Sequence, residues 1–433
     1  MLEGLYRKRL GQDLAHWQKQ GWVTAEGATA ILASVGADRS AVSLSAVIAV
    51  LGAVLLGFGV MSLVAANWEL IPRLTRFVVL VGAMGLVYAL AAVLHRRNHP
   101  AFAEAALLLA GLVFAAAIAL VAQSYHLSGE FPDAVLLWAV GCLGGALLAR
   151  SAALTVLALL GSAFWTGLVT FDLGSPHWAG LVPILAGGAL ATLLDSRPGR
   201  TCAVLALGAW IAITIVVLVT YHRWPDSGGY ALGAVAALAL WTAGSALASL
   251  RTRPRLASLG HDMLWPSLGA CLAWLAVLQA LSYPRHWGSD RAWLAMSGLS
   301  LAVAAVGAVF AWRRKALGMV DVLAVLGLGA GSIALAFWLP PDGFAARLIG
   351  GCLVMLGALW VVSLGQSGRQ PAGKTTGLVV FGLEAIYLYT VTLGTMFDTA
   401  LAFLGGGVLF IALSVTLIRI DRRLAARAMG ASA

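Results

Sequence analysis

Apolar stretches of about 20 residues recur along almost the whole chain, and this feature constrains the fold more than any other. A helix that crosses a lipid bilayer needs about 20 mainly apolar residues, with a range of about 17–25. The pattern therefore predicts an all-α fold, a polytopic membrane helix bundle. Fourteen stretches are long enough, at roughly residues 43–66, 74–94, 102–122, 133–149, 151–171, 178–194, 200–220, 230–250, 262–282, 292–312, 317–338, 345–365, 375–394 and 397–418. The fourth and the sixth are short, and only Arg150 and Ser151 separate the fourth from the fifth.

The composition excludes a soluble protein. Hydrophobic residues make up 61% of the chain and charged residues 11%, whereas soluble domains have about 45–50% apolar and about 25% charged residues.

Residues 1–42 are polar and are predicted to form a cytoplasmic helical hairpin, which Gly21 breaks and whose second helix Thr24 caps. So short a hairpin buries little surface, and we expect it to dock on the membrane domain or on a protein partner. Residues 43–418 form the expected bundle, and residues 419–433 form a basic cytoplasmic tail.

The positive charges predict the orientation of the chain. The net charge is +10. With a cytoplasmic N-terminus and fourteen crossings, 22 of the 28 Lys and Arg residues fall in cytoplasmic segments. Cytoplasmic loops of membrane proteins carry such an excess. We therefore expect a bacterial inner-membrane protein that contacts the lipid bilayer and has both termini in the cytoplasm. Because the basic residues lie in short clusters between apolar stretches, they do not indicate nucleic-acid binding.

The sequence predicts no metal, cofactor or nucleotide site and no catalytic residue. The four cysteines lie singly in apolar stretches and lack the paired spacing of a disulfide framework or a zinc site. Residues 368–375 match the P-loop pattern, but a P-loop follows a strand and opens a helix of a soluble domain. This segment joins two predicted membrane helices, so the match is interpreted as a coincidence. We expect that the protein is not an enzyme.

Two predicted outer turns contain candidate functional residues. The first includes Asn67, Trp68 and Glu69, and Asn67 could cap the preceding helix. The second, residues 123–133, has no Lys or Arg and is rich in hydrogen-bonding groups. Both turns are interpreted either as caps of helix ends or as part of a ligand or partner site, and we expect them to lie together on one face. The candidates in the second turn are Gln123, Tyr125, His126, Glu130 and Asp133.

Three elements resemble the bacterial family of predicted membrane proteins catalogued as domain of unknown function 2157. They are the hairpin with Trp17, Gly21 and Ala30-Ile31; the turn at residues 65–72; and residues 123–129 followed by Trp138. The resemblance covers roughly residues 5–150, and within residues 43–150 it includes the first four predicted membrane helices. It implies a membrane protein and carries over no activity.

Glu384 is the only acidic residue deep inside a predicted membrane helix, about midway along residues 375–394. Tyr387 lies about one turn away on the same face. A charge at this depth costs about 2.5–3.5 kcal/mol even on the mildest scale. We therefore expect Glu384 to be neutral, to contact polar partners or to face a wet cavity, and not to face lipid. A functional role and a structural hydrogen bond to a tyrosine remain equal alternatives.

Two function classes remain open. A transporter or permease for a small or amphipathic solute, proton-coupled through Glu384, is favoured by the number of helices, their 50 glycines and the buried carboxyl. A non-transporting membrane scaffold or envelope-assembly factor is favoured by the scarcity of intramembrane charge.

Overall fold

The computed structural model describes residues 72–125, 129–222, 224–280, 292–338, 344–368, 370 and 372–393, and separate positions between residues 10 and 62. Within this part of the chain every regular element is a helix, and no strand is present. The predicted all-α fold class is thus confirmed for the described residues. The predicted helix at 397–418 and the basic tail lie outside them, as do most of the hairpin and most of the predicted helix at 43–66.

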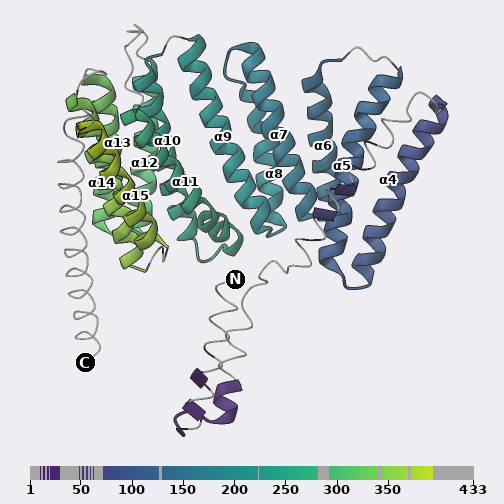
Figure 1. Ribbon diagram of the computed structural model, residues 1–433, viewed down its shortest axis with the longest axis horizontal. Coiled ribbons are helices and arrows are strands. Elements are labelled where there is room, and N and C mark those ends of the chain that lie inside the picture. The colour runs from purple at the N-terminus through teal and green to yellow at the C-terminus, as the bar shows by residue number, and fades with distance from the viewer. Residues whose placement is uncertain are drawn as a thin grey trace. The chain divides into compact units, whose positions relative to one another are not determined.

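Twelve α-helices and one short 3₁₀ helix follow one another through the described ranges (Figure 1). In chain order they are α4 (Arg73–Arg96), α5 (Pro100–Tyr125), α6 (Phe131–Ala149), α7 (Ala152–Leu173), η2 (Trp178–Gly180), α8 (Leu181–Leu193), α9 (Arg197–Tyr221), α10 (Asp226–Ala248), α11 (Pro254–Ala280), α12 (Ala292–Arg313), α13 (Met319–Trp338), α14 (Phe344–Gln366) and α15 (Gly373–Leu393).

Each of the twelve predicted helices that falls on described residues is helical. The narrow division between α6 and α7 is real. Arg150 adopts a left-handed conformation with φ 53°, and the Ser151 hydroxyl then caps α7 by accepting a hydrogen bond from the Leu154 N–H at 3.3 Å. The sixth predicted helix is short as expected, since α8 has 13 residues.

The main difference from the sequence prediction concerns α11. It begins at Pro254, eight residues before the predicted start at 262. Hydropathy detects only the apolar part of a helix, whereas a proline is well suited to the first helical position because its φ is fixed and its missing N–H needs no partner. The polar first turns of α11 carry His261 and Asp262, which apolarity alone does not assign to a helix.

Ten helices in the described part of the chain are long and apolar enough to cross a membrane. Helix α8 is too short to be counted, and α15, with Lys374 and Glu384, is not among the ten. Large apolar side chains lie on the surfaces of these helices; Leu148, for example, is 87% exposed. Such exposure is typical of helices that face lipid. The protein is therefore a multi-pass membrane protein, while the total of fourteen crossings stays a prediction.

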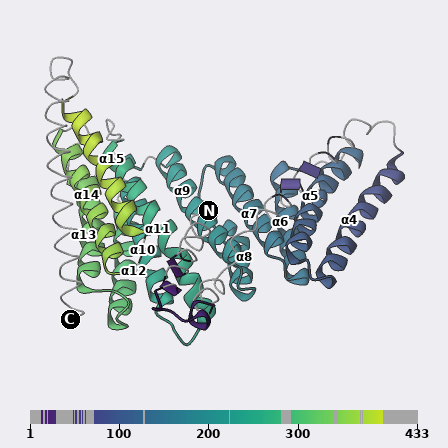
Figure 2. The same cartoon turned by 60° about the horizontal axis from the view of Figure 1, so that its bottom comes forward.

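The chain divides into two compact units, residues 1–117 and 118–433, with the boundary inside α5. In the second unit, α10 packs against α9, α11, α12 and α13. A buried cluster that includes Trp241, Leu268 and Val325 fills the space between α10, α11, α12, α13 and α14. Helix α15 lies along α14, as both views show (Figures 1 and 2).

Side-chain contacts in the second unit join helix ends that the sequence assigns to the same side of the membrane. The Trp360 indole N–H donates to Asp321, linking the predicted inner ends of α14 and α13 at 3.1 Å. The Ser227 hydroxyl donates to the Ala336 carbonyl at 3.3 Å, linking the predicted outer ends of α10 and α13. These contacts fit helices that cross in alternating directions.

The described positions of residues 17–29 contain the predicted break in the N-terminal segment. Gly21 has φ 75°, a left-handed conformation that favours glycine. The Thr24 hydroxyl then accepts a hydrogen bond from the Gly27 N–H at 3.1 Å, as the predicted cap requires.

Candidate functional site

The candidate residues of the outer turns are only partly described. Asn67, Trp68, Glu69 and His126 lie outside the described residues. Gln123 and Tyr125 belong to the last turn of α5. The expectation that the two turns lie together on one face therefore stays a prediction.

Glu130 and Asp133 are exposed at the start of α6. Glu130 occupies the N-cap position, and its carbonyl accepts a hydrogen bond from the Asp133 N–H at 3.1 Å. Asp133 lies in the first turn, where a negative charge interacts favourably with the helix dipole. Both residues thus have a local role in starting α6.

Glu384 lies in a pocket of about 430 Å³ between α11, α14 and α15. Its side chain comes from the middle of α15, and the residue is only 6% exposed. Tyr387 follows one turn later and lines the same pocket. Sequence position alone predicted that Glu384 faces protein or a cavity, and this is where the structure places it.

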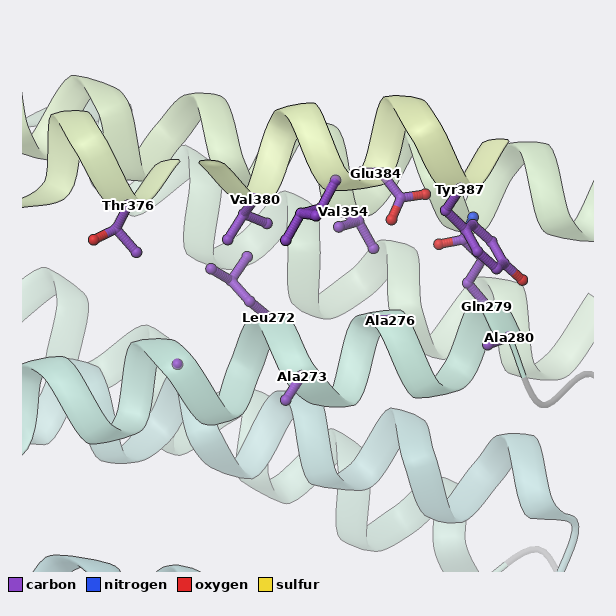
Figure 3. Close-up of a pocket in the computed structure, with 12 residues that line it drawn as sticks. Leu272, Ala273, Ala276, Gln279, Ala280, Val354, Thr376, Val380, Glu384 and Tyr387 are labelled. Atoms are coloured by element: carbon purple, nitrogen blue, oxygen red, sulfur yellow. The ribbon is translucent and has the colours of Figure 1, made fainter. Parts of the chain in front are cut away.

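One end of the pocket is polar. Figure 3 shows Glu384, Tyr387 and Gln279 grouped there, with Thr376 at the opposite end. Gln279 comes from α11, is 1% exposed and lies beside the Glu384 carboxyl (Figure 3). The rest of the wall is apolar or small, and consists of Gly269, Leu272, Ala273, Ala276, Ala280, Val354, Val380 and Leu383.

Two adjacent glycines of α14 make room for Gln279. A Cβ atom at Gly350 would lie 3.0 Å from the Gln279 Cβ, and one at Gly351 would lie 2.9 Å from the Gln279 Nε2. Side chains at these two positions would push the amide away from its present place. The polar end of the pocket therefore depends on the backbone of α14 as well as on the three side chains that form it.

The Glu384 carboxyl is only partly satisfied. Its Oε1 atom is buried and has no hydrogen-bond partner. No Lys, Arg or His lines the pocket, so none of the lining residues neutralises a charge on Glu384. A buried carboxylate without a counter-charge is unfavourable. The group must carry a proton, or a bound cation must pair with it.

Sequence reasoning identified Glu384 and Tyr387 but missed Gln279. A signal was available, because Gln279 is the only glutamine in the predicted helix 262–282. The glycines opposite it could not have been singled out among the 50 in the chain.

Two further carboxyls near helix ends are paired: Asp321 is buried, and the Asp262 side chain is 11% exposed. Asp262 accepts a hydrogen bond from the Arg200 Nε at 2.7 Å, and Arg200 also bonds Asp195 at 2.6 Å. Asp321 accepts from the Trp360 indole and, at 2.7 Å, from the Gly318 N–H at the start of α13. These contacts connect helix ends.

Among the described residues no group of three or more His, Cys, Asp or Glu side chains could hold a metal ion. The P-loop-like segment follows α14 and leads into α15. The Gly373 N–H at the start of α15 donates to the Gln370 carbonyl at 2.8 Å. The segment thus lies between two helices and does not follow a strand.

Comparison with known proteins identifies the N-terminal third of the chain. Residues 15–155 match the family described as "Predicted membrane protein (DUF2157)", which confirms the resemblance seen in the sequence. The search of curated proteins and the search of solved structures each found no match. The pocket on α11, α14 and α15 lies beyond the matched residues, so the family match assigns it no role.

Proposed function

We propose that the protein is a permease-like carrier of a small or amphipathic solute, which binds in the pocket between α11, α14 and α15. The observation that carries this proposal is the buried Glu384 carboxyl, which lines the pocket and has one oxygen, Oε1, without a hydrogen-bond partner. Ionisable groups inside membrane proteins are expensive and commonly belong to substrate or proton pathways. The volume of about 430 Å³ is also within the usual range of ligand sites, about 300–1,000 Å³.

The proposed setting is a bacterial inner membrane, with α15 embedded in it, fourteen crossings in all and both termini cytoplasmic. Single cysteines at Ser128, Ser227 and Ser367 of a cysteine-free variant test this orientation with an impermeant thiol reagent on intact cells. We expect labelling at positions 128 and 227 and none at 367. The reverse pattern would overturn the topology.

Glu384→Gln tests the proposed role of the carboxyl. Glutamine keeps the shape and most hydrogen bonds but cannot release a proton. We expect unchanged expression and thermal stability, together with loss of the cellular phenotype that the wild-type gene restores to a deletion strain. The matched control is Asp172→Asn, which removes one exposed carboxyl from the end of α7 and should restore the phenotype fully. An active Glu384→Gln variant would remove the main support for a carrier.

A membrane scaffold or envelope-assembly factor is the alternative, and one observation favours it. Asp262 and Asp321 are committed to structural contacts, so Glu384 is the single buried carboxyl with an unpaired oxygen in the described part of the chain. Ion-coupled carriers usually have more than one such group. If Glu384→Gln is silent while changes in residues 1–42 abolish the phenotype, the scaffold is the better description.

A further inference from the structure

We infer that the solute is a protonated amine on an apolar body, and that its ammonium group replaces the proton on Glu384. The inference rests on the proposed solute-binding role of the pocket and specifies the class of solute. Three features support it: no basic side chain lines the pocket, the side chains of Glu384, Tyr387 and Gln279 can accept hydrogen bonds, and the remaining wall is apolar.

The polar end offers acceptors that suit an ammonium group. An ammonium has three N–H donors and no acceptor. The Glu384 carboxylate, which has unused acceptor capacity at Oε1, can accept one of them, and the oxygens of Tyr387 and of the Gln279 amide are the other acceptors at this end (Figure 3). A carboxylate solute would be repelled by an ionised Glu384. A neutral solute would leave the buried charge uncompensated and so would require the protonated form.

No charged side chain in the described part of the chain takes the place of the cation. Among the described helices, α14 packs against α15 and α11 lines the pocket with it. Of the residues that line the pocket, Glu384 and Tyr387 are the only titratable ones. Arg347 lies on α14 one turn before Gly350 but does not line the pocket and forms no ion pair with Glu384. Lys374 is ten residues before Glu384, about 15 Å along the helix.

The remaining wall favours an apolar body on the amine. Leucine, valine and alanine side chains line the space between the polar end and Thr376. Burial of hydrocarbon against such a wall adds affinity in proportion to the apolar area removed from water. A bare ammonium or alkali-metal ion would leave most of this wall without contacts.

The exchange is balanced in charge. An ammonium ion enters the pocket, a carboxyl–ammonium ion pair forms, and the carboxyl proton leaves to solvent. One positive charge replaces another, so the site stays neutral before and after binding. Opposite movements of amine and proton would then be coupled through a single carboxyl.

The test compares 4-phenylbutylamine with its neutral counterpart 4-phenylbutan-1-ol, using the purified full-length protein in lipid nanodiscs. Calorimetric titration should show that wild type binds the amine at least about tenfold more tightly than the alcohol, because hydrogen bonds to charged groups are stronger. In Glu384→Gln this preference should fall to about one, whereas Asp172→Asn should keep it. Equal binding of both compounds by wild type would overturn the inference that the solute is an amine. The proposal that the pocket binds a solute would survive that result.

Proton release provides a second readout that does not depend on the affinity of a variant. Addition of the amine to wild type in weakly buffered solution should release protons, while addition of the alcohol should release none. If the amine binds and no proton leaves, the exchange is wrong. If neither compound binds to wild type, both the inference and the use of this pocket for amphipathic solutes fail, whatever the cellular phenotype of Glu384→Gln.

Discussion

Two buried polar centres in residues 118–433 differ in how completely their charges are paired. At the end of α8 and the starts of α9 and α11, the Arg200 guanidinium is held by Asp195 and Asp262 at 2.6 and 2.7 Å. In the pocket of α11, α14 and α15, the Glu384 carboxyl has one oxygen without a partner. Arg200 is 5% exposed and Glu384 6%, whereas the Asp195 side chain, at the edge of the first centre, is 64% exposed.

This difference separates a structural contact from a candidate site. A buried ion pair joins helices, and its groups have no remaining capacity for a solute. A carboxyl with an open acceptor adds little to helix packing and retains the capacity to bind. Substitutions at the Arg200 centre should therefore lower stability, whereas substitutions at Glu384 should abolish function with little loss of stability. The following variants test this contrast.

Asp262→Ala should have the largest effect on stability. It leaves the buried Arg200 guanidinium with Asp195, whose side chain is 64% exposed, as its remaining hydrogen-bonded carboxylate, and loss of a hydrogen bond to a charged group costs about 1.5–3 kcal/mol. SDS-induced unfolding followed by tryptophan fluorescence would measure the change. The control is Arg197→Ala, which removes a 76% exposed side chain 3.6 Å from Asp262 and should cost less than about 1 kcal/mol. Equal effects of the two variants would mean that Asp262 does not hold α11 through Arg200.

Gly260→Ala should have the next largest effect, because Gly260 lies two residues before Asp262 where α10 and α11 approach closely. A Cβ atom here would lie 2.5 Å from the Gly244 carbonyl oxygen and would also clash with the backbone of Ala248. Backbone atoms cannot rotate away, so the helices must separate, at a cost of about 1–3 kcal/mol. Gly269→Ala on the same helix is the control, since its Cβ meets nothing within 4 Å. A silent Gly260→Ala would show that this contact does not position Asp262.

The contrast between the two centres also shows what sequence can predict here. The helices were predictable because the bilayer sets their length and apolarity, and even the break at Arg150 was visible. Glu384 was predictable because a single acid in an apolar helix is conspicuous. Its neighbour Gln279 was not, because helices that are apolar on all sides do not reveal which face is turned toward which other helix. The pairing of Arg200 with Asp262 was missed for the same reason and because hydropathy left the polar first turns of α11 unassigned.

Glu384→Leu should have a smaller effect on stability and tests the contrast directly. The variant removes a buried oxygen that lacks a partner, which is favourable, and it loses at most the interaction with Gln279. Hydrogen bonds between membrane helices contribute about 0.6 kcal/mol on average. We therefore expect a change of no more than about 1 kcal/mol in SDS unfolding, with loss of function. A large loss of stability would instead identify Glu384 as a structural contact to Tyr387 or Gln279.

Substitution of His177 should have the smallest effect on stability. Like Glu384, His177 has a buried polar atom without a hydrogen-bond partner. It lies in the turn between α7 and η2, with its ring 4.7 Å from the Trp165 ring and its Nδ1 buried without a partner. Burial lowers the pKa of His177 below its usual 6.5, because the charged form loses hydration. The unfolded chain therefore takes up the proton first as the pH falls. The stability that the neutral ring contributes is complete above about pH 6.5 and is lost as the pH falls from there through the lowered pKa.

His177→Phe keeps an aromatic ring against Trp165 and cannot titrate, so thermal unfolding between pH 7.5 and 5 should depend less on pH than in wild type. An identical pH dependence in the two proteins would show that His177 is as well hydrated in the folded protein as in the unfolded chain.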